Sequence, residues 1–509
     1  MNRAASASLP ASDVGERWRL FPILVLFGAI VTATAAIIGN GNLLVAMAPL
    51  GLLIALWAIW HAPLRIPLFW TMFLALALDS TGDGPWNSPV AWLGALIDLN
   101  LNLAFPVAAL TFPGLAVILG YLLVVHAHRR LSGSRIDDSG RLGVAPAIRW
   151  AITCSLLALL IWSALGYARG GNLQMVKIQV QTHLMILAAG CLLAATMRGM
   201  RDFRILAAIV VAAACIKALL ALYVVRTVVM PSEAELAVAT SHGDSVLFAC
   251  AVTILLVHFA ENPTRRSMFA CLLLLPLLVG GVLANNRRIA WAEIGAGAVL
   301  FFVMSRPSRF KRFVIRGFLL TLPLVIMYVS VGWSSGAKIF APVRTFRSMQ
   351  DEQVDGSTMF REIENYNLLQ TRKLHPWIGS GFGHPFVMFE QTPDLSFFKE
   401  YPYMPHNSIL GLWASTGVFG FTALFMVLNV CVLLAARSYY RARSPDERTA
   451  AFVAIATVLI YEIHCWGDIG FSERRSIFLV GAACAVASRL AVSTRAWGYT
   501  RHHGTLGQA

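Results

Sequence analysis

The chain has 509 residues, of which 57% are hydrophobic and 13% are charged, and its mean hydropathy is +0.67. Soluble domains carry about 25% charged residues, so this composition excludes an ordinary soluble protein. The net charge of +15 would suit a nucleic-acid partner, but in membrane proteins basic residues gather in short loops that set orientation. We therefore predict an all-α, polytopic transmembrane bundle and no nucleic-acid partner.

Apolar stretches run almost from end to end. Residues 1–19 are polar, and no cleavage-like site follows the first apolar stretch, so we expect a retained span rather than a signal peptide. A span needs roughly 20 apolar residues, which divides the chain into about fourteen spans. They are expected near residues 20–38, 43–60, 66–78, 103–126, 148–165, 180–197, 205–225, 245–260, 268–284, 289–304, 313–331, 407–435, 450–466 and 475–490. The eight cysteines lack metal-ligand spacing, and we interpret them as packing residues.

Arginine-rich loops alternate with loops that are nearly free of basic residues. Residues 129–149, 198–204 and 306–312 are strongly basic, whereas residues 79–89 and 230–244 are not. Because basic loops stay in the cytoplasm, both termini are predicted to be cytoplasmic.

One long segment without spans follows the eleventh predicted span and should lie on the outer face. The predicted organisation is therefore a first bundle over 1–331, a long loop over 332–405 and C-terminal transmembrane helices over 406–509. Loops of this length without spans are usually functional.

Basic residues also occur at two outer positions, where the charge rule disfavours them. Arg287 and Arg288 lie between two predicted spans, and Arg474 and Arg475 precede the last one. Something other than orientation should account for them, and Arg475 is a candidate supporting residue of a site.

Within the long loop, residues 358–374 are predicted to form an amphipathic helix, with Met359, Ile363, Tyr366 and Leu369 on one face. His375-Pro376 should end this helix. The glycines of the following GSGFG turn, residues 379–383, are expected to shape the loop rather than contact a ligand.

Three outer elements suit the chemistry of phosphate and proton transfer. An arginine fork binds two phosphate oxygens and stays charged, so Arg287 or Arg288, together with Arg361, would suit a lipid diphosphate leaving group. The imidazole of His406 would accept a proton from a sugar hydroxyl near neutral pH. No acidic cluster in the sequence suggests a metal site, and no cofactor is expected.

Each of these residues also has a plainer explanation. Arg287 and Arg288 could anchor to lipid headgroups by snorkelling. Arg361 could pair with Glu362 or Glu364 on a solvated helix face, and His406 could simply flank the Asn-Ser start of a helix.

The order of these pieces resembles the O-antigen ligase and O-antigen polymerase family. The matching pieces are NNRRIAWAEIGAGAVLFF, MFREIENYNLLQTRKLHPWIGSGFGHPF and MPHNSILGLWASTGVFGF. The detailed resemblance covers about residues 283–433, and the rest is similar only as a generic bundle.

Residue by residue, Arg288 matches the family's span-opening arginine, with Trp291 three residues later. Arg361 matches its loop-helix arginine, and His406 matches its functional histidine, with Asn407 beside it. Trp291 and Asn407 are candidate supporting residues.

The resemblance implies metal-independent, inverting transfer of a glycan from an undecaprenyl-diphosphate carrier, on the periplasmic face of a bacterial inner membrane. The acceptor would be a lipid A core for a ligase, or another lipid-linked glycan for a polymerase, with membrane lipids as surroundings. Asn286-Arg287 stands where a Ser-Arg pair is more usual, so Arg287 stays an alternative to Arg288 as the ligand.

Other polar residues lie in or beside spans, where charges are functional candidates by default. Glu293 could orient the arginines, and His464 could pair with Glu462 near the outer end. His242 and Asp244 enter a span from the outer side and could line the same cavity. An interhelical hydrogen bond explains each of them equally well.

Two further functions remain open. A transporter or flippase of lipid-linked glycan would use midplane charges, and Lys217 and Glu462 are candidates for these. A transferase with a carboxylate base would use Asp79 or Asp83, although this outer loop is also a typical Asp- and Gly-rich turn.

Overall fold

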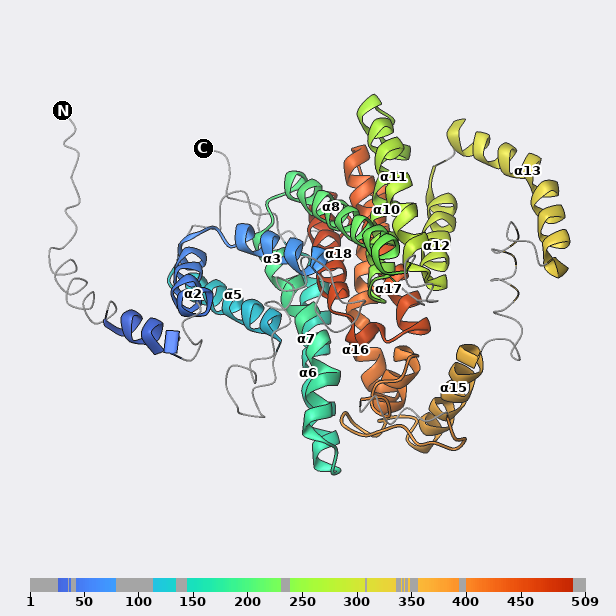
Figure 1. The fold of residues 1–509 in the computed structure, drawn as a ribbon. Helices are drawn as coiled ribbons and strands as arrows, with labels where there is room; N and C mark the ends of the chain where they lie inside the picture. The colour runs from blue at the N-terminus through green and yellow to red at the C-terminus, as the bar shows by residue number, and fades with distance from the viewer. Residues whose placement is uncertain are drawn as a thin grey trace, which may run out of the picture. The chain divides into compact units, whose positions relative to one another are not determined.

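The computed structural model describes residues 26–34, 36–37, 43–78, 113–133, 144–229, 239–306, 309–335, 340, 343, 347, 356–392 and 400–497. Its helices are drawn in Figure 1. Contacts divide the chain into two compact units, residues 1–67 and 68–509. The residues discussed below all lie in the second unit.

The helices occur in the following order along the chain. The first group is α2 (Leu43–His61), α3 (Arg65–Ala77), α5 (Gly114–Leu131), α6 (Pro146–Ala168), α7 (Leu173–Thr196), α8 (Met200–Val224) and the π-helical turn η3 (Val225–Val229). The second group is α10 (Asp244–Glu261), α11 (Arg265–Asn285), α12 (Arg288–Met304), α13 (Arg309–Ser334), α15 (Gly356–Leu374), α16 (Ser408–Arg441), α17 (Pro445–Gly467), the 3-10 turn η5 (Gly470–Ser472) and α18 (Arg474–Ser493).

The helical membrane bundle that the sequence predicts is confirmed. Within the described residues, ten helices are long and apolar enough to cross a membrane. Wherever the structure describes a predicted span, it is helical except at single residues, which are Leu78, Pro113, Met197 and Asn407. The total of about fourteen spans and the division at residues 331 and 405 remain predictions.

Helix α7 begins seven residues before the predicted start at residue 180, at Leu173. The side chain of Asn172 caps it by accepting hydrogen bonds from the backbone N–H groups of Gln174 at 2.9 Å and Met175 at 3.3 Å. The polar first turns of α7 lower the local hydropathy, so a search for apolar residues begins the span too late.

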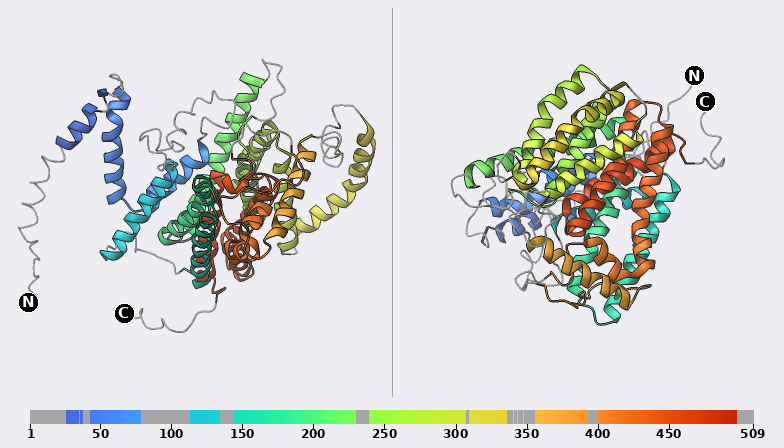
Figure 2. Two further views of the ribbon diagram at one scale, coloured as in Figure 1. Left: turned by 90° about the horizontal axis from the view of Figure 1, so that it is seen from below. Right: turned by 90° about the vertical axis from the view of Figure 1, so that its right-hand side faces the viewer.

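Helices α10, α17 and α18 form the centre of this unit, since 67%, 61% and 83% of their most apolar windows are buried. Helix α17 contacts α10, α12, α16 and α18. The views in Figure 2 show the C-terminal helices, in orange and red, running beside the green and yellow helices of the middle of the chain. Four helices thus surround α17.

The same four helices begin at the end of the unit where α17 terminates. Four contacts at this end join the starts of these helices to one another or to Asp468, which follows α17: His242 with Asp468, Arg287 with His242, Ser408 with the Asp468 carbonyl, and Arg475 with Asp244. The N-terminus of a helix carries a partial positive charge. Four such ends therefore face one region, which favours an anion there.

Helix α15 is present as predicted and ends at Leu374, directly before His375-Pro376. The apolar residues named from its spacing do not form its buried face, because Met359, Tyr366 and Leu369 are exposed and Ile363 is half-buried, whereas Glu364 and Leu368 are buried. Leu368 belongs to a small core with Phe386, Tyr401 and Leu410 at the start of α16.

The polar residues on the buried face of α15 satisfy backbone groups. The side-chain oxygen of Asn367 accepts hydrogen bonds from the N–H groups of Phe389 and Glu390 at 2.9 and 2.8 Å, and its amide donates to the Glu390 carbonyl at 2.8 Å. The helix therefore holds the chain segment that follows the glycine turn.

The turn at residues 379–383 is wedged between α6 and α16. All three of its glycines have positive φ, which L-residues with a side chain adopt at a cost. A Cβ on Gly381 would lie 2.4 Å from the Cα of Gly166 in α6. On the other side, α16 is broken at Gly417, with φ of 61°, and the N–H groups of Val418 and Phe419 bond to the carbonyls of Pro376 and Trp377. The turn is a docked element, in agreement with the role in loop shape that the sequence predicts.

Candidate active site

Arg287 is positioned by the tight connection between α11 and α12. Asn286 has φ of 50°, so the chain reverses within one residue, and Arg287 becomes the residue that precedes α12. The side-chain oxygen of Asn285 accepts hydrogen bonds from the backbone and hydroxyl of Thr240, which ties this connection to the segment before α10.

Arg287 is the first of three polar side chains that are linked by hydrogen bonds. Its Nη2 lies 2.6 Å from Nε2 of His242, and Nδ1 of His242 lies 2.5 Å from Oδ2 of Asp468. A guanidinium only donates, so Nε2 of His242 accepts and the ring proton sits on Nδ1, facing the carboxylate. Burial by itself raises the pKa of Asp468, but the hydrogen bond and charge of His242, the charge of His464 and the N–H of Ile469 together hold this pKa below its usual range.

Arg361 of α15 lies close enough to Arg287 to influence it electrostatically. Burial lowers the pKa of Arg287, the charge of Asp468 opposes this effect, and the positive charge of Arg361 lowers the pKa further. In the described part of the chain, no carboxylate forms an ion pair with Arg361. Two arginines from distant segments thus face the same region, and a bound anion would relieve their repulsion.

Arg288 is the first residue of α12 and is half-buried. The partial positive charge at a helix N-terminus destabilises the cation of Arg288. An anion bound at the same place is stabilised both by the helix dipole and by the Arg288 side chain. Trp291, one turn later, is 46% exposed and therefore does not pack in the core.

His406 is held by a buried carboxylate on α15. Its Nδ1 lies 3.1 Å from Oε2 of Glu364, and Oε1 of Glu364 accepts a hydrogen bond from the backbone N–H of Asn407 at 3.2 Å. The side chain of Glu364 is 1% exposed and that of His406 is 24% exposed. A carboxylate at Nδ1 favours the tautomer whose Nε2 carries a lone pair. His406 is therefore an accessible base with an oriented ring.

Rings of Phe360 and Tyr401 flank the imidazole, with centroid distances of 5.4 and 6.4 Å. Burial raises the pKa of the Tyr401 hydroxyl, and the charge of Glu364 raises it further. Tyr401 is therefore neutral near pH 7 and adds no charge beside His406.

Asn407 positions the start of α16. Its side-chain oxygen accepts from the N–H of Leu410 at 3.1 Å, and its amide donates to Asn365 of α15 at 2.9 Å. The hydroxyl of Ser408 donates to the carbonyl of Asp468 at 3.3 Å. These bonds connect the His406 end of the site with the His242–Asp468 pair.

Glu293 and His464 bind each other rather than the partners considered from the sequence. Oε1 of Glu293 lies 2.9 Å from Nδ1 of His464, and both side chains are almost completely buried. Five residues of helix turn Glu293 by about 140° from Arg288, so it faces α17 instead of the arginines. Similarly, Glu462 and His464 point about 200° apart on α17. This pair joins α12 to α17 beneath the site.

Arg475 is neutralised by acidic neighbours. Its Nε lies 3.0 Å from Oδ1 of Asp244 and its Nη1 lies 3.5 Å from Oε1 of Glu473, and it also donates to the hydroxyl of Ser241. The Nζ of Lys217 lies 3.8 Å from the same oxygen of Asp244. Arg475 thus fixes the start of α18 against α10, and Lys217 has a structural partner.

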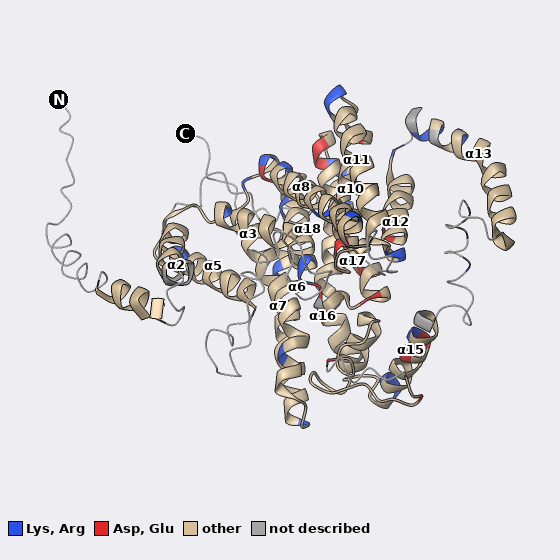
Figure 3. Ribbon diagram, in the orientation of Figure 1, with Lys and Arg blue, Asp and Glu red and all other residues tan. Residues whose placement is uncertain are grey.

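Sequence reasoning missed Asp468 and considered Glu364 only as a partner of Arg361, whereas Glu364 is buried and holds His406. Asp468 directly follows the outer end of α17. Its position at the outer end of a predicted span is the sequence signal that could have identified it. Glu364 lies one turn after Arg361, a spacing that places both on neighbouring parts of one helix surface. Figure 3 shows that charged residues gather at helix ends and on α15, while most of the helix surfaces are neutral.

A model of the family described as O-antigen ligase matches residues 271–425. This segment runs from α11 into α16 and contains Arg287, Arg288, Arg361 and His406. We found no match to a curated protein. The match confirms the resemblance for this part of the chain.

Proposed function

From the match of residues 271–425 to the O-antigen ligase family, which supports an O-antigen ligase or polymerase type of function in a multi-pass membrane protein, we propose a specific reaction. The chain transfers a glycan from undecaprenyl diphosphate to a sugar hydroxyl on the periplasmic face of the inner membrane. The observation that carries this proposal is that α15 bears both Arg361, whose charge acts on Arg287 before α12, and Glu364, whose carboxylate holds His406.

In this proposal the diphosphate of the donor binds between Arg361 and the start of α12. Arg287 and Arg288 supply charge there, and the N-terminus of α12 supplies N–H groups that point toward the same place. The carrier chain would lie in the surrounding lipid. Charge that develops on the leaving diphosphate is stabilised by groups already in position, so little reorganisation is needed.

His406 takes the proton of the acceptor hydroxyl. The hydroxyl oxygen attacks the anomeric carbon, the bond from that carbon to the phosphate oxygen breaks, and the diphosphate leaves with the electron pair. The proton goes to Nε2 of His406, while the Nδ1 proton stays bonded to Glu364. Attack opposite the leaving group inverts the anomeric carbon. No step of this reaction requires a metal ion or a cofactor.

The acceptor is a lipid A core in the ligase version and another lipid-linked glycan in the polymerase version. Both versions use the same leaving-group site. The product therefore distinguishes them, and the residues described above do not.

The test is complementation of a deletion strain with wild type and with Arg288→Ala, Arg361→Ala and His406→Ala, and surface glycans are separated on a gel. Loss of one charge-stabilising group typically costs 10²–10³-fold in rate, and loss of a general base costs 10²–10⁴-fold. Each variant should therefore leave the glycan untransferred. Bare lipid A core would identify a ligase, and cores capped by a single repeat would identify a polymerase.

Two exposed residues provide matched controls. Lys373→Ala removes a cation from the same helix as Arg361, and His375→Ala removes an exposed imidazole. Both should complement fully, with protein amounts checked by immunoblot. Normal glycans from well-expressed Arg361→Ala and His406→Ala variants would refute the proposal.

The alternative functions have weaker support. The transporter hypothesis relied on Lys217 and Glu462, and the ion pair of Lys217 with Asp244 gives Lys217 a structural role. The carboxylate-base hypothesis relied on Asp79 and Asp83, which lie outside the described residues.

A further inference from the structure

A large cavity lies at the opposite end of the bundle from the candidate active site. It has a volume of about 560 Å³ and is lined by residues of α8, α10, α11, α17 and α18, together with Met72 of α3. Helix α10 begins at the candidate site with Asp244 and reaches the cavity with His258. At 1.5 Å per residue, His258 at the far end of the cavity is about 20 Å from Asp244 along this helix, and Cys250, the lining residue of α10 nearest to the site, is about 9 Å from it.

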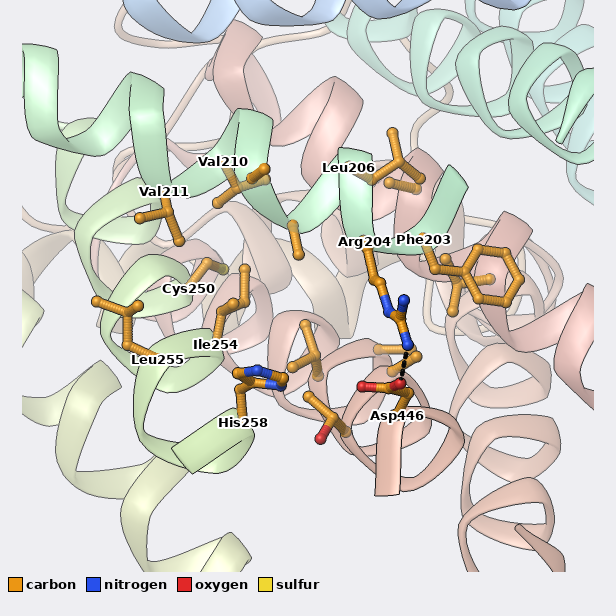
Figure 4. Close-up of a pocket in the computed structure, with 18 of the residues that line it drawn as sticks. Phe203, Arg204, Leu206, Val210, Val211, Cys250, Ile254, Leu255, His258 and Asp446 are labelled. Atoms are coloured by element: carbon orange, nitrogen blue, oxygen red, sulfur yellow. Dashed lines mark hydrogen bonds and ion pairs between the residues drawn. The ribbon is translucent and has the colours of Figure 1, made fainter. Parts of the chain in front are cut away.

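The interior of the cavity is apolar. Side chains of Val210, Cys250 and Ile254 face into it from α8 and α10 (Figure 4), and Ala454 and Leu479 line it from α17 and α18. All five side chains are buried inside the bundle. Such a lining suits a hydrocarbon chain rather than water or a sugar.

The rim of the cavity is polar and predominantly basic. It contains Arg204, His258, Asn262, Arg266 and Asp446. Arg204 forms an ion pair with Asp446 (Figure 4), so that carboxylate offsets one of the two arginines. The remaining charge at the rim is positive, with Arg266 exposed at the start of α11.

We propose that this cavity binds an anionic diacyl phospholipid. An acyl chain of this lipid lies in the apolar interior, and its phosphate lies at the rim beside Arg266. Basic pockets between transmembrane helices on the cytoplasmic side characteristically hold anionic headgroups. The arginine-rich end of α8 and α11 is the predicted cytoplasmic end.

The distance from the candidate active site favours a resident phospholipid over the carrier lipid. A donor whose diphosphate is bound near Arg287 cannot also place that diphosphate at a rim about 20 Å away along α10. A headgroup bound at the rim therefore belongs to a lipid other than a donor bound at the candidate site, and the proposal for this cavity does not depend on the transferase reaction.

Lipid binding is measured by native mass spectrometry of the purified full chain in detergent, titrated with phosphatidylglycerol or phosphatidylethanolamine. Wild type should bind one phosphatidylglycerol molecule more tightly than phosphatidylethanolamine. Arg266→Gln should weaken phosphatidylglycerol binding about tenfold, because it removes a charged hydrogen-bond donor. The matched control is Arg265→Gln, since Arg265 is an exposed neighbour that does not line the cavity.

A second pair of variants tests the apolar interior. Ala208→Trp places a large ring in the cavity, whereas Ala212→Trp, one turn later on α8, changes an exposed alanine that does not line it. Only the first substitution should reduce the bound lipid. If Ala208→Trp fails to fold, the arginine pair alone decides the result.

Three results would overturn the proposal. The first is binding by Arg266→Gln that equals binding by Arg265→Gln. The second is equal affinity of wild type for phosphatidylethanolamine and phosphatidylglycerol. The third is displacement of phosphatidylglycerol by equimolar undecaprenyl phosphate, which would assign the cavity to the carrier lipid.

Discussion

The substitution Glu364→Gln replaces one carboxylate oxygen beside His406 by an amide nitrogen and keeps the size of the side chain. The amide oxygen can still accept the hydrogen bond from the backbone N–H of Asn407. The amide nitrogen can only donate, so it selects the tautomer in which Nδ1 of His406 accepts and Nε2 carries the proton. In that tautomer His406 cannot take a proton from the acceptor.

The expected loss is the whole contribution of the base. General-base catalysis typically supplies 10²–10⁴-fold in rate, which corresponds to about 3–5 kcal/mol of the activation barrier. The fold should be little affected, because the substitution at this buried position keeps the volume of the side chain and both of its hydrogen bonds, with the direction of the bond to His406 reversed. We therefore expect kcat to fall by at least about 100-fold while KM for the donor stays within about threefold.

The assay uses purified protein in proteoliposomes with a lipid-linked glycan donor, and initial rates are measured from glycan transferred per unit time. Glu362→Gln is the control, because Glu362 lies on the same helix and is exposed. The double variant Glu364→Gln/His406→Ala should be no slower than His406→Ala alone, since both changes remove the same base.

Wild-type rates from a folded Glu364→Gln variant would refute this reasoning. So would a double variant that is slower than His406→Ala by the full effect of Glu364→Gln, because the two residues would then act independently.

Further predictions concern the support of the site. Gly417→Ala should lower Tm by several degrees, since φ is 61° and its Cβ would lie 2.4 Å from the backbone of Trp377 and Ile378, a strain of about 1–3 kcal/mol. Gly295→Ala, where a Cβ meets open space, should leave Tm unchanged or raise it, and a similar Tm for both variants would contradict the strain argument. Asp468→Asn should raise KM for the donor about tenfold and change kcat less, because His242 loses the carboxylate that orients it against Arg287. Initial rates over a range of donor concentrations measure this effect, and an unchanged KM would mean that Arg287 does not need this support.

The transmembrane helices are predictable from the sequence because a single physical quantity, the thickness of the hydrocarbon core, sets their length. Their ends are less predictable. Asn172 starts α7 two turns before the apolar residues become dense, because its side-chain cap depends on local hydrogen bonds rather than hydropathy.

The orientation of α15 was not predictable from its apolar pattern. Glu364 and Asn367 face inward because each satisfies backbone N–H groups of distant segments. Met359 and Leu369 stay exposed although they recur at helical spacing. A hydrophobic pattern indicates the buried face only where that face meets apolar groups.

The pairing of polar residues from distant spans was likewise not predictable from the sequence. His242 and Asp468 are 226 positions apart in the sequence, and no local pattern links them. The sequence does show polar residues at several helix ends, among them Asn172, Asn407 and Asp468. Which of these residues meet depends on how the four helices surround α17.

The docked glycine turn limits how this protein can be divided for engineering. Residues 379–383 rest on Gly166 and on Asn172, whose N–H donates to the Gly383 carbonyl at 2.9 Å, and both of these residues lie outside the segment 271–425 that matches the family model. A chimera that exchanges only the matched segment would seat the turn on a foreign surface. Exchange of acceptor specificity between related chains should therefore carry the end of α6 and the start of α7 together with the loop.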